Sequence, residues 1–224
     1  PVILVTRNLE PVYDNASAIR ALALVRARVP HAQLVVAGSG PEKTRLKQLA
    51  ESLKLEDSVR FTGRVEVADM PALYRSAQVS LNPSRVDNMP NSVLEALAAG
   101  VPVVSTRVGG VPYMVEHEKT ALLVEPGVVA DMAEAIVRIL TDPALAERLR
   151  VAGLEMAQTY TWSRIKPQLF KVYQEAIRHQ VFSLSDIAAD AVRFRGDAES
   201  GLTDATNKHK RRWLEMLKVK AQVT

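Results

Sequence analysis

Two carboxylates eight residues apart stand out in residues 82–104, NPSRVDNMPNSVLEALAAGVPVV. Asp87 is expected in a loop that follows a buried strand, and Glu95 lies inside a helix expected to begin near Pro90 and Asn91. The free amides and the positive dipole end of a helix N-terminus attract a phosphate group and keep a nearby carboxylate ionised. An ionised carboxylate accepts hydrogen bonds from sugar hydroxyls. The segment therefore predicts a site for a ligand that carries phosphate and hydroxyl groups.

The same segment resembles the signature of the family 4 glycosyltransferases (glycosyl transferases group 1), E-x7-E followed by EAxAxGxPVV. The resemblance implies that Glu95 binds the two ribose hydroxyls of a nucleotide and that Asp87 lies by the donor sugar. Asp87 stands where the family has a glutamate, and its side chain is one methylene shorter. We therefore expect that the Asp87 side chain reaches less far than the family's glutamate or that the chain accepts a different donor sugar. The alternative is structural, with Asp87 as a helix N-cap and Glu95 as a surface glutamate.

The N-terminal segment ILVTRNLEPVYD resembles the family's opening strand and loop, xxVGRLxxxKG, in which an arginine and a lysine bind the diphosphate. Arg7 matches the arginine, whereas Val12 and Tyr13 occupy the region of the lysine. An arginine can bind phosphate oxygens bidentately. Without the second cation we expect weaker diphosphate binding, unless Arg20 or Arg85 substitutes for it. The alternative for Arg7 is an ordinary surface arginine at a strand end.

Three further motifs follow in the family's order. VVAGSGPE resembles the GxGPE turn, FTGRV resembles the loop that frames the base, and STRVGGVPYMV resembles the GGxPEIV element near the sugar and phosphates, with Tyr113 in place of its glutamate. The resemblance thus makes Arg7 and Asp87 the candidate catalytic residues. The expected donor-binding residues are Glu95, Gly38, Gly40, Arg64, Val65, Arg85, Asn88, Met89, Pro90, Asn91, Ser92, Gly109, Gly110 and Val111.

The resemblance runs from about Ile3 to His179 and implies the C-terminal, donor-binding half of a retaining GT-B glycosyltransferase. It implies a nucleotide-diphosphate sugar as the donor, no metal ion or cofactor, and a leaving diphosphate stabilised by cations and backbone amides. The N-terminal acceptor half is absent from this sequence, so we expect nucleotide binding but no transfer, because one wall of the site is missing. The resemblance also implies a cytoplasmic enzyme with a glycan or lipid-linked acceptor and peripheral membrane association of the full enzyme.

The composition is that of a globular protein, with 224 residues, 47% hydrophobic and 24% charged. No cysteine is present, which excludes disulfides and thiolate chemistry, and the four histidines lack metal-ligand spacing. The net charge of +4 suits an anionic small ligand, and we expect no nucleic-acid partner. No apolar run approaches the roughly 20 residues of a membrane span. Since the chain starts at Pro1 without a signal peptide or initiator methionine, we interpret it as a fragment or a processed chain.

Short apolar runs alternate with helical patterns over residues 1–180. We expect strands at 2–5, 34–37, 59–62, 79–82, 101–105 and 121–124, and helices at 16–28, after Pro41, and at 69–74, 91–99, 130–140, 143–160 and 161–179, the last kinked near Pro167. Asp69 and Asp131 are expected as helix caps. This order predicts an α/β fold, a Rossmann-like doubly wound parallel sheet that binds ligands at the carboxyl ends of its strands.

We expect residues 181–224 to form a separate tail that is helical and basic, with helices at 182–195 and 203–219. This tail could also be fusion sequence. The second helix contains KHKRRW, a basic cluster with one aromatic residue. Such a cluster could contact nucleic acid or a membrane surface. We favour the simpler interpretation, a solvated helix face, because one short patch is a weak signal.

Two other classes of protein share this kind of sheet. One is half of a nucleotide-sugar epimerase or hydrolase with the same two-domain scaffold, which would need its own acid–base carboxylates and histidine. The other is a non-enzymatic Rossmann-like binding or interaction domain of the response-regulator type, which would need an acidic cluster on the first loop. That loop offers Arg7 with only Glu10 and Asp14.

Overall fold

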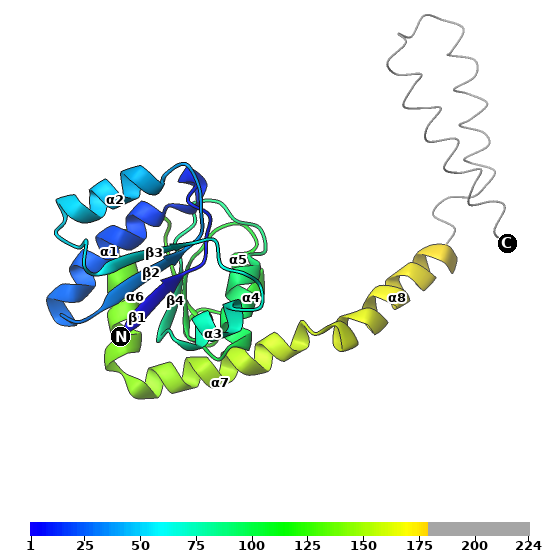
Figure 1. The fold of residues 1–224 in the computed structure, drawn as a ribbon. Coiled ribbons are helices and arrows are strands. Elements are labelled where there is room, and N and C mark those ends of the chain that lie inside the picture. The colour runs from blue at the N-terminus through cyan, green and yellow to red at the C-terminus, as the bar shows by residue number, and fades with distance from the viewer. Residues whose placement is uncertain (179–224) are drawn as a thin grey trace, which may run out of the picture. The chain divides into compact units, whose positions relative to one another are not determined.

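The computed structural model describes residues 1–178, so the expected tail helices at 182–195 and 203–219 lie outside the described residues. The chain divides into two compact units, Pro1–Ile165 and Lys166–Thr224. This division falls before residue 180, where the sequence predicts the end of the Rossmann-like domain, and that boundary stays a prediction. The first unit contains every described strand (Figure 1).

Six parallel strands form one sheet in the order β3-β2-β1-β4-β5-β6 (Figure 1). The strands are β1 Val2–Val5, β2 Gln33–Ala37, β3 Val59–Gly63, β4 Val79–Asn82, β5 Val103–Thr106 and β6 Leu122–Val124. The expected doubly wound parallel sheet is thereby confirmed. The strand order reverses direction between β1 and β4, and ligands of such sheets bind at this point, outside the carboxyl ends of the strands.

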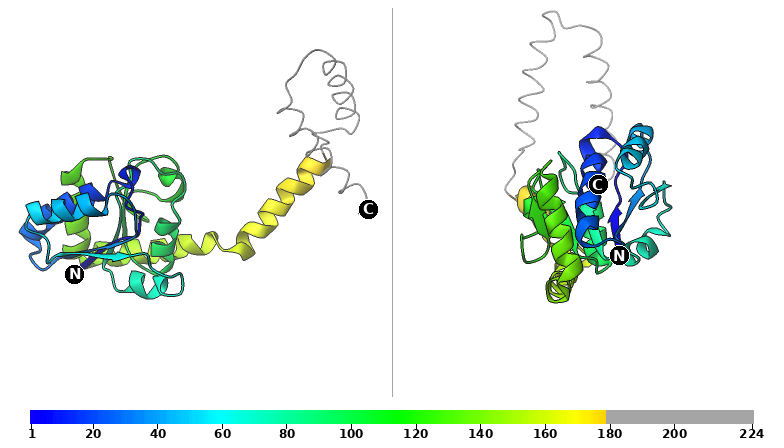
Figure 2. Two further views of the ribbon diagram at one scale, coloured as in Figure 1. Left: turned by 45° about the horizontal axis from the view of Figure 1, so that its top comes forward. Right: turned by 90° about the vertical axis from the view of Figure 1, so that its left-hand side faces the viewer.

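Helices cover both faces of the sheet, as Figure 2 shows from two further sides. On one face lie α1 Asn15–Arg28, α2 Lys43–Ser52 and α6 Val129–Thr141, and on the other lie α3 Met70–Arg75, α4 Asn91–Ala98 and α5 Val111–Met114. Successive residues of a strand point to opposite faces. Accordingly Ile3 and Val5 pack into the first core, whereas Leu4 between them packs into the second. Both faces are thus buried, which explains the continuous apolar runs in the sequence.

Two further helices follow, α7 Pro143–Thr159, which packs on α4 and α6, and α8 Trp162–Arg178, which contains Pro167. Two short elements were not expected, the 3-10 turn η1 Pro11–Tyr13 and the helix α5, because each is too short to show a periodic pattern. Asp69 is the N-cap residue of α3, as predicted, although its side chain makes no capping hydrogen bond. The capping prediction for Asp131 was wrong, because Asp131 lies inside the first turn of α6 and Val128 is the N-cap residue.

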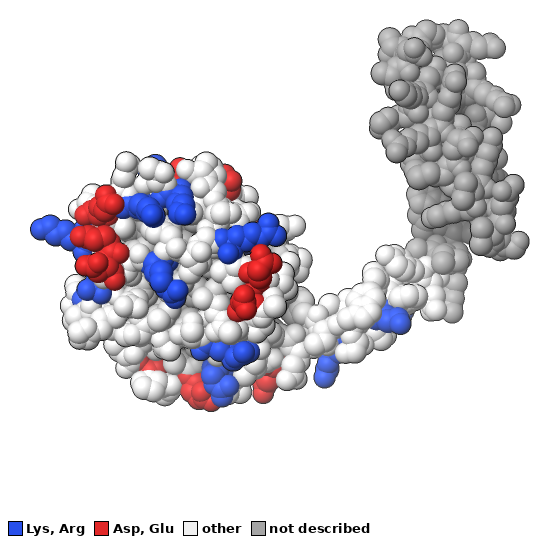
Figure 3. Space-filling model, in the orientation of Figure 1, with Lys and Arg blue, Asp and Glu red and all other residues white. Residues whose placement is uncertain are grey.

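The surface of the described residues carries charges of both signs. On the face drawn in Figure 3, lysine and arginine side chains are interspersed with aspartate and glutamate. None of the helices in residues 1–178 has the length and apolar character needed to cross a membrane.

Candidate functional site

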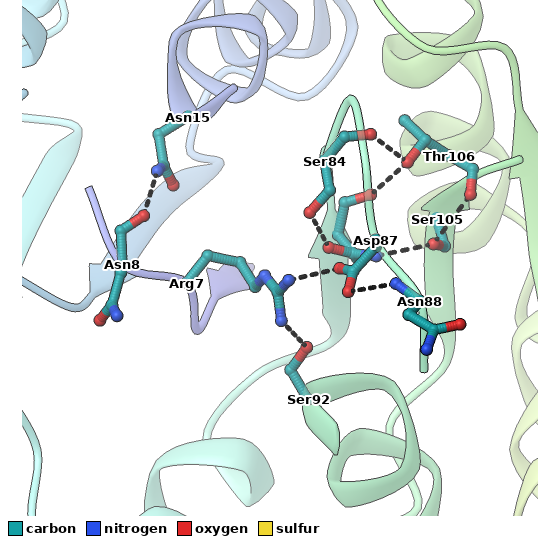
Figure 4. A network of polar contacts seen from close by, with 10 residues as sticks. Arg7, Asn8, Asn15, Ser84, Asp87, Asn88, Ser92, Ser105 and Thr106 are labelled. Atoms are coloured by element: carbon teal, nitrogen blue, oxygen red, sulfur yellow. Dashed lines mark hydrogen bonds and ion pairs between the residues drawn. The ribbon is translucent and has the colours of Figure 1, made fainter. Parts of the chain in front are cut away.

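Arg7 and Asp87, the two candidate catalytic residues, are in direct contact (Figure 4). Arg7 follows β1 and Asp87 lies in the loop between β4 and α4, so the neighbouring strands β1 and β4 bring their carboxyl ends together. The Arg7 Nη2 atom forms an ion pair with Asp87 Oδ2. Both side chains are largely buried, at 12% and 10% exposure, which makes this pair a fixed part of the site rather than a transient surface contact.

The Arg7 guanidinium is held on two further sides. Its Nη1 atom donates a hydrogen bond of 3.3 Å to Ser92 Oγ, at the start of α4. The ring of Tyr13 covers the guanidinium carbon at 4.1 Å, within the range of a cation–π contact. Tyr13 occupies the region where the family has its lysine, so this chain has an aromatic ring beside the arginine in place of a second cation.

The N-terminus of α4 lies beside this guanidinium. Pro90 is its N-cap residue and supplies no side-chain hydrogen bond to the first turn. The first amides of a helix have no partner within the helix, so those of Asn91 and Ser92 can donate hydrogen bonds to a phosphate oxygen. The preceding residues Asn88 and Met89 are exposed, and Met89 is 54% exposed. The expected anion-binding turn therefore lies next to Arg7.

A buried polar network fixes the base of the loop that carries Asp87 (Figure 4). Ser84 Oγ donates to Asn82 Oδ1 at 2.8 Å, and Asn82 Nδ2 donates to Ser105 Oγ at 3.1 Å. Thr106 Oγ1 donates to the Ser84 carbonyl at 2.6 Å. Ser84, Ser105 and Thr106 have no exposed surface, so each of these bonds replaces a solvent contact that the fold has removed.

The glycines of the two glycine-rich motifs lie where neighbouring loops touch. A Cβ atom on Gly109 would lie 1.8 Å from the Asp87 carbonyl oxygen, and one on Gly110 would lie 1.9 Å from that of Asn88. A Cβ on Gly38 would lie 2.2 Å from the carbonyl oxygen of Arg7, and Gly40 faces Leu9 in the same way. The resemblance implies that these glycines lie close to the ligand, which stays a prediction. Their packing role in the structure is to let the loops that carry Arg7 and Asp87 pack on their neighbours.

Glu95 lies further along α4 and is exposed, without a contact to the ion pair of Arg7 and Asp87 among the described residues. Its Oε2 atom accepts a hydrogen bond of 2.9 Å from the hydroxyl of Tyr74 on α3. Burial is the main cause that raises the pKa of Tyr74 well above its ordinary value. Sequence reasoning missed Tyr74, because a tyrosine on an amphipathic helix is normally interpreted as a packing residue.

The other expected cations, Arg85 and Arg64, have no described contact with the ion pair of Arg7 and Asp87. Arg85 Nε binds Asp14 Oδ2 at 2.9 Å, its backbone amide donates to the Val12 carbonyl at 2.8 Å, and its side chain is 59% exposed. Among the described contacts, none joins Arg85 to Arg7.

Arg64 is exposed and Val65 half-buried, and both follow Gly63 at the end of β3. Val111 begins α5 and is buried, and its amide donates to the Val108 carbonyl at 3.0 Å.

No group of three or more His, Asp or Glu residues suited to a metal ion occurs in residues 1–178. The candidate site itself offers one carboxylate paired to an arginine and one carboxylate paired to a tyrosine. These groups favour an anionic and hydroxylated ligand. The expectation of a metal-free reaction stays a prediction.

The doubly wound sheet, with its candidate site at the switch between β1 and β4, has the Rossmann-like fold of one half of a GT-B glycosyltransferase. The family described as "Glycosyl transferases group 1" matches residues 1–156. The chain belongs to this family.

Two curated relatives illustrate the family's activities. A GDP-mannose-dependent alpha-(1-6)-phosphatidylinositol monomannoside mannosyltransferase of Mycobacterium tuberculosis is 33% identical over 177 residues, which cover 75% of this chain and 46% of that protein. A D-inositol 3-phosphate glycosyltransferase of Saccharomonospora viridis is 34% identical over 185 residues, covering 79% of this chain and 43% of that protein. This chain thus spans less than half the length of these relatives.

Solved structures show the same fold. A sucrose-phosphate synthase of Thermosynechococcus elongatus has a TM-score of 0.73 and 30% identity, over 80% of this chain and 46% of that chain. The Anabaena protein HepE, in complex with UDP and glucose, has a TM-score of 0.71 and 24% identity, over 77% of this chain and 48% of that one. The C-terminal domain of a glycosyl transferase group 1 protein of Francisella tularensis is matched over 85% of its length, with a TM-score of 0.66 and 21% identity. The fold of this chain is therefore that of a C-terminal GT-B domain.

Proposed function

We propose that this chain is the donor-binding half of a retaining glycosyltransferase, and that it binds a nucleoside diphosphate sugar at the N-terminus of α4. One observation carries the proposal. Arg7 lies at the first turn of α4, in contact with Ser92, while Glu95 lies on the same helix. A cation from the loop after β1 and the free amides of α4, both suited to phosphate, thereby lie beside a helix that also carries an acceptor suited to hydroxyls.

The diphosphate would lie against the amides of Asn91 and Ser92, next to the Arg7 guanidinium. A guanidinium aimed at phosphate oxygens stabilises the charge that develops on a leaving diphosphate, with no need for a metal ion. Asp87, which pairs with Arg7, would then contact the sugar that the diphosphate carries. The retaining reaction would then break the bond between the sugar and the diphosphate, at a point between Asp87 and the N-terminus of α4, and transfer the sugar to the acceptor.

Glu95 is the proposed ribose ligand. Its carboxylate is exposed, and Tyr74 holds its Oε2 atom, which leaves Oε1 available to ribose hydroxyls. Relatives support a nucleotide ligand of this class, since one is a GDP-mannose-dependent enzyme and the HepE structure contains UDP and glucose. Because these two use different bases, the proposal leaves the base to experiment.

The acceptor would be bound by a second half, because this chain spans less than half of the relatives' length. We propose that the chain alone binds the donor but does not transfer the sugar, since one wall of the site is missing and water has free access. The complete enzyme would act in the cytoplasm on a glycan or lipid-linked acceptor, with peripheral membrane association.

Calorimetric titration with UDP, GDP and ADP tests the proposal. We expect weak binding of one of them and loss of most of that binding in Glu95→Ala, because two hydrogen bonds to an ionised acceptor are worth about 1.5–3 kcal/mol each. Glu155→Ala, a change at an exposed glutamate of α7, is the matched control and should keep the parent affinity. An unchanged dissociation constant in Glu95→Ala would exclude the ribose assignment, and absence of binding by the unaltered chain would overturn the proposed function.

A further inference from the structure

Tyr74 is a buried tyrosine whose hydroxyl lies where three elements meet. Its side chain comes from α3 and packs in the core beneath α4, with 2% of its surface exposed. The hydroxyl lies 2.8 Å from Thr6 Oγ1 at the end of β1, 2.9 Å from Glu95 Oε2 and 3.3 Å from the Ser92 carbonyl oxygen. A residue needed only for packing would not require a hydroxyl at this junction.

The direction of these hydrogen bonds follows from the chemistry of the partners. A tyrosine hydroxyl has one proton to donate, and an ionised carboxylate is a stronger acceptor than a carbonyl. Tyr74 therefore donates to Glu95 and accepts from the Thr6 hydroxyl. A tyrosine hydroxyl is protonated at neutral pH, and burial raises the pKa of Tyr74 further, so this hydroxyl remains a donor.

This arrangement restricts Glu95 before any ligand arrives. A free glutamate on a helix surface samples many rotamers, and fixing it on binding costs conformational entropy. Tyr74 fixes Oε2 on the core side of the carboxylate, so Oε1 points away from that contact. Thr6 precedes Arg7 in the chain, so the same hydroxyl links Glu95 to the strand end that carries the arginine.

We propose that Tyr74 is a positioning residue for nucleoside recognition, which with Thr6 holds Glu95 in the orientation that accepts both ribose hydroxyls. The inference rests on the proposed function and adds to it a buried determinant of the preference for ribonucleotides. Tyr74 contacts no ligand itself and acts through Glu95.

The test compares three ligands in calorimetry: the nucleoside diphosphate that binds best, its 2′,3′-dideoxy form, and inorganic pyrophosphate. In Tyr74→Phe we expect the dissociation constant of the ribonucleotide to rise roughly three- to tenfold, the range for loss of one hydrogen bond. The affinities for the dideoxy form and for pyrophosphate should not change, because neither offers hydroxyls to Glu95. Thr6→Val should give a smaller rise, since Thr6 acts one bond further away.

Tyr173→Phe, at a tyrosine that is 55% exposed on α8, is the matched control, and urea unfolding of each variant checks the fold. An equal loss for all three ligands would show a merely structural role and overturn the inference. It would also be overturned if Tyr74→Phe kept the parent affinity while Glu95→Ala lost it, an outcome that leaves the proposed function standing. If the unaltered chain bound no nucleoside diphosphate, the proposed function would fail, and this inference with it.

Discussion

The Arg7 guanidinium is paired with the Asp87 carboxylate, although the family resemblance assigns the first residue to the diphosphate and the second to the sugar. The electrostatic fields of two opposite charges in contact largely cancel away from the pair, and this pair is largely shielded from water. A diphosphate bound as proposed would therefore meet an arginine that already has an ion-pair partner. In a chain that also lacks the family's lysine, this pairing gives a physical reason to expect weak nucleotide binding.

Asp87→Asn should increase the affinity for nucleoside diphosphate and for pyrophosphate. The change removes a negative charge beside the phosphates and releases Arg7, and we expect a gain of about three- to tenfold. In a protein rejoined to its acceptor half, the same change should lower turnover, because the neutral amide binds sugar hydroxyls less strongly. Calorimetry and a transfer assay measure the two effects.

Asp131→Asn, at an exposed acid in the first turn of α6, is the charge-matched control for Asp87→Asn and should leave both quantities unchanged. A lower nucleotide affinity in Asp87→Asn would show that the carboxylate orients Arg7 for binding instead of competing with the ligand. Transfer at the parent rate would remove Asp87 from the catalytic residues.

Val12→Lys should restore a second cation near the diphosphate. Val12 is 38% exposed and occupies the region of the family's lysine, so a longer side chain has access to solvent there. A charge-assisted hydrogen bond to phosphate would increase nucleoside diphosphate affinity by about tenfold. Val151→Lys, at a 41% exposed valine of α7, controls for added net charge. Equal gains in both variants would show that the effect depends on net charge and not on position.

A comparison of Gly110→Ala with Gly63→Ala should distinguish the effect of a close loop contact on the free energy of unfolding from the effect of backbone conformation. Gly110 has an ordinary φ of −83°, yet an added Cβ would lie 1.9 Å from the Asn88 carbonyl oxygen. Gly63 has a φ of 73° and open space around it, so alanine there costs only about 1–2 kcal/mol of backbone strain. We expect Gly110→Ala to lower the free energy of unfolding by more than this, about 3 kcal/mol or above. Urea denaturation measures both, and an equal or smaller loss in Gly110→Ala would show that the two loops can separate without cost.

Nucleotide binding should not depend on a divalent cation. The groups beside the proposed phosphate position are a guanidinium and helix amides, and these neutralise phosphate charge without a metal ion. Titration of nucleoside diphosphate should therefore give the same dissociation constant in EDTA and in magnesium. Binding that requires magnesium would contradict the metal-free proposal.

The helix α8 should make the chain self-associate. Trp162, Phe170 and Tyr173 on this helix are 62%, 49% and 55% exposed, and exposed apolar patches favour association. Light scattering at increasing protein concentration should show an increase in mean mass, which Trp162→Ser with Tyr173→Ser should reduce. Val151→Ser, on α7, is the control. A strictly monomeric chain at high concentration would contradict this expectation.

Local patterns in the sequence were sufficient to predict the parallel sheet and the family. Apolar runs such as Val2–Val5 and Val79–Asn82, separated by amphipathic stretches, indicate buried parallel strands, because both faces of such strands lose contact with water. The signature around Asp87 and Glu95 depends on residues that are neighbours in the chain. These features are encoded within short windows and need no knowledge of distant contacts.

Tertiary structure alone decided which side chains meet. Arg7 reaches Asp87 because β1 pairs with β4, two strands that are far apart in the sequence, and Tyr74 reaches Glu95 because α3 and α4 pack on the same face. Arg85 meets Asp14 for the same reason. Hydrophobic periodicity predicts each helix and strand separately. Which loops lie side by side depends on the order of the strands in the sheet and on glycines that let neighbouring backbones touch. Such contacts exist only once the whole sheet has assembled.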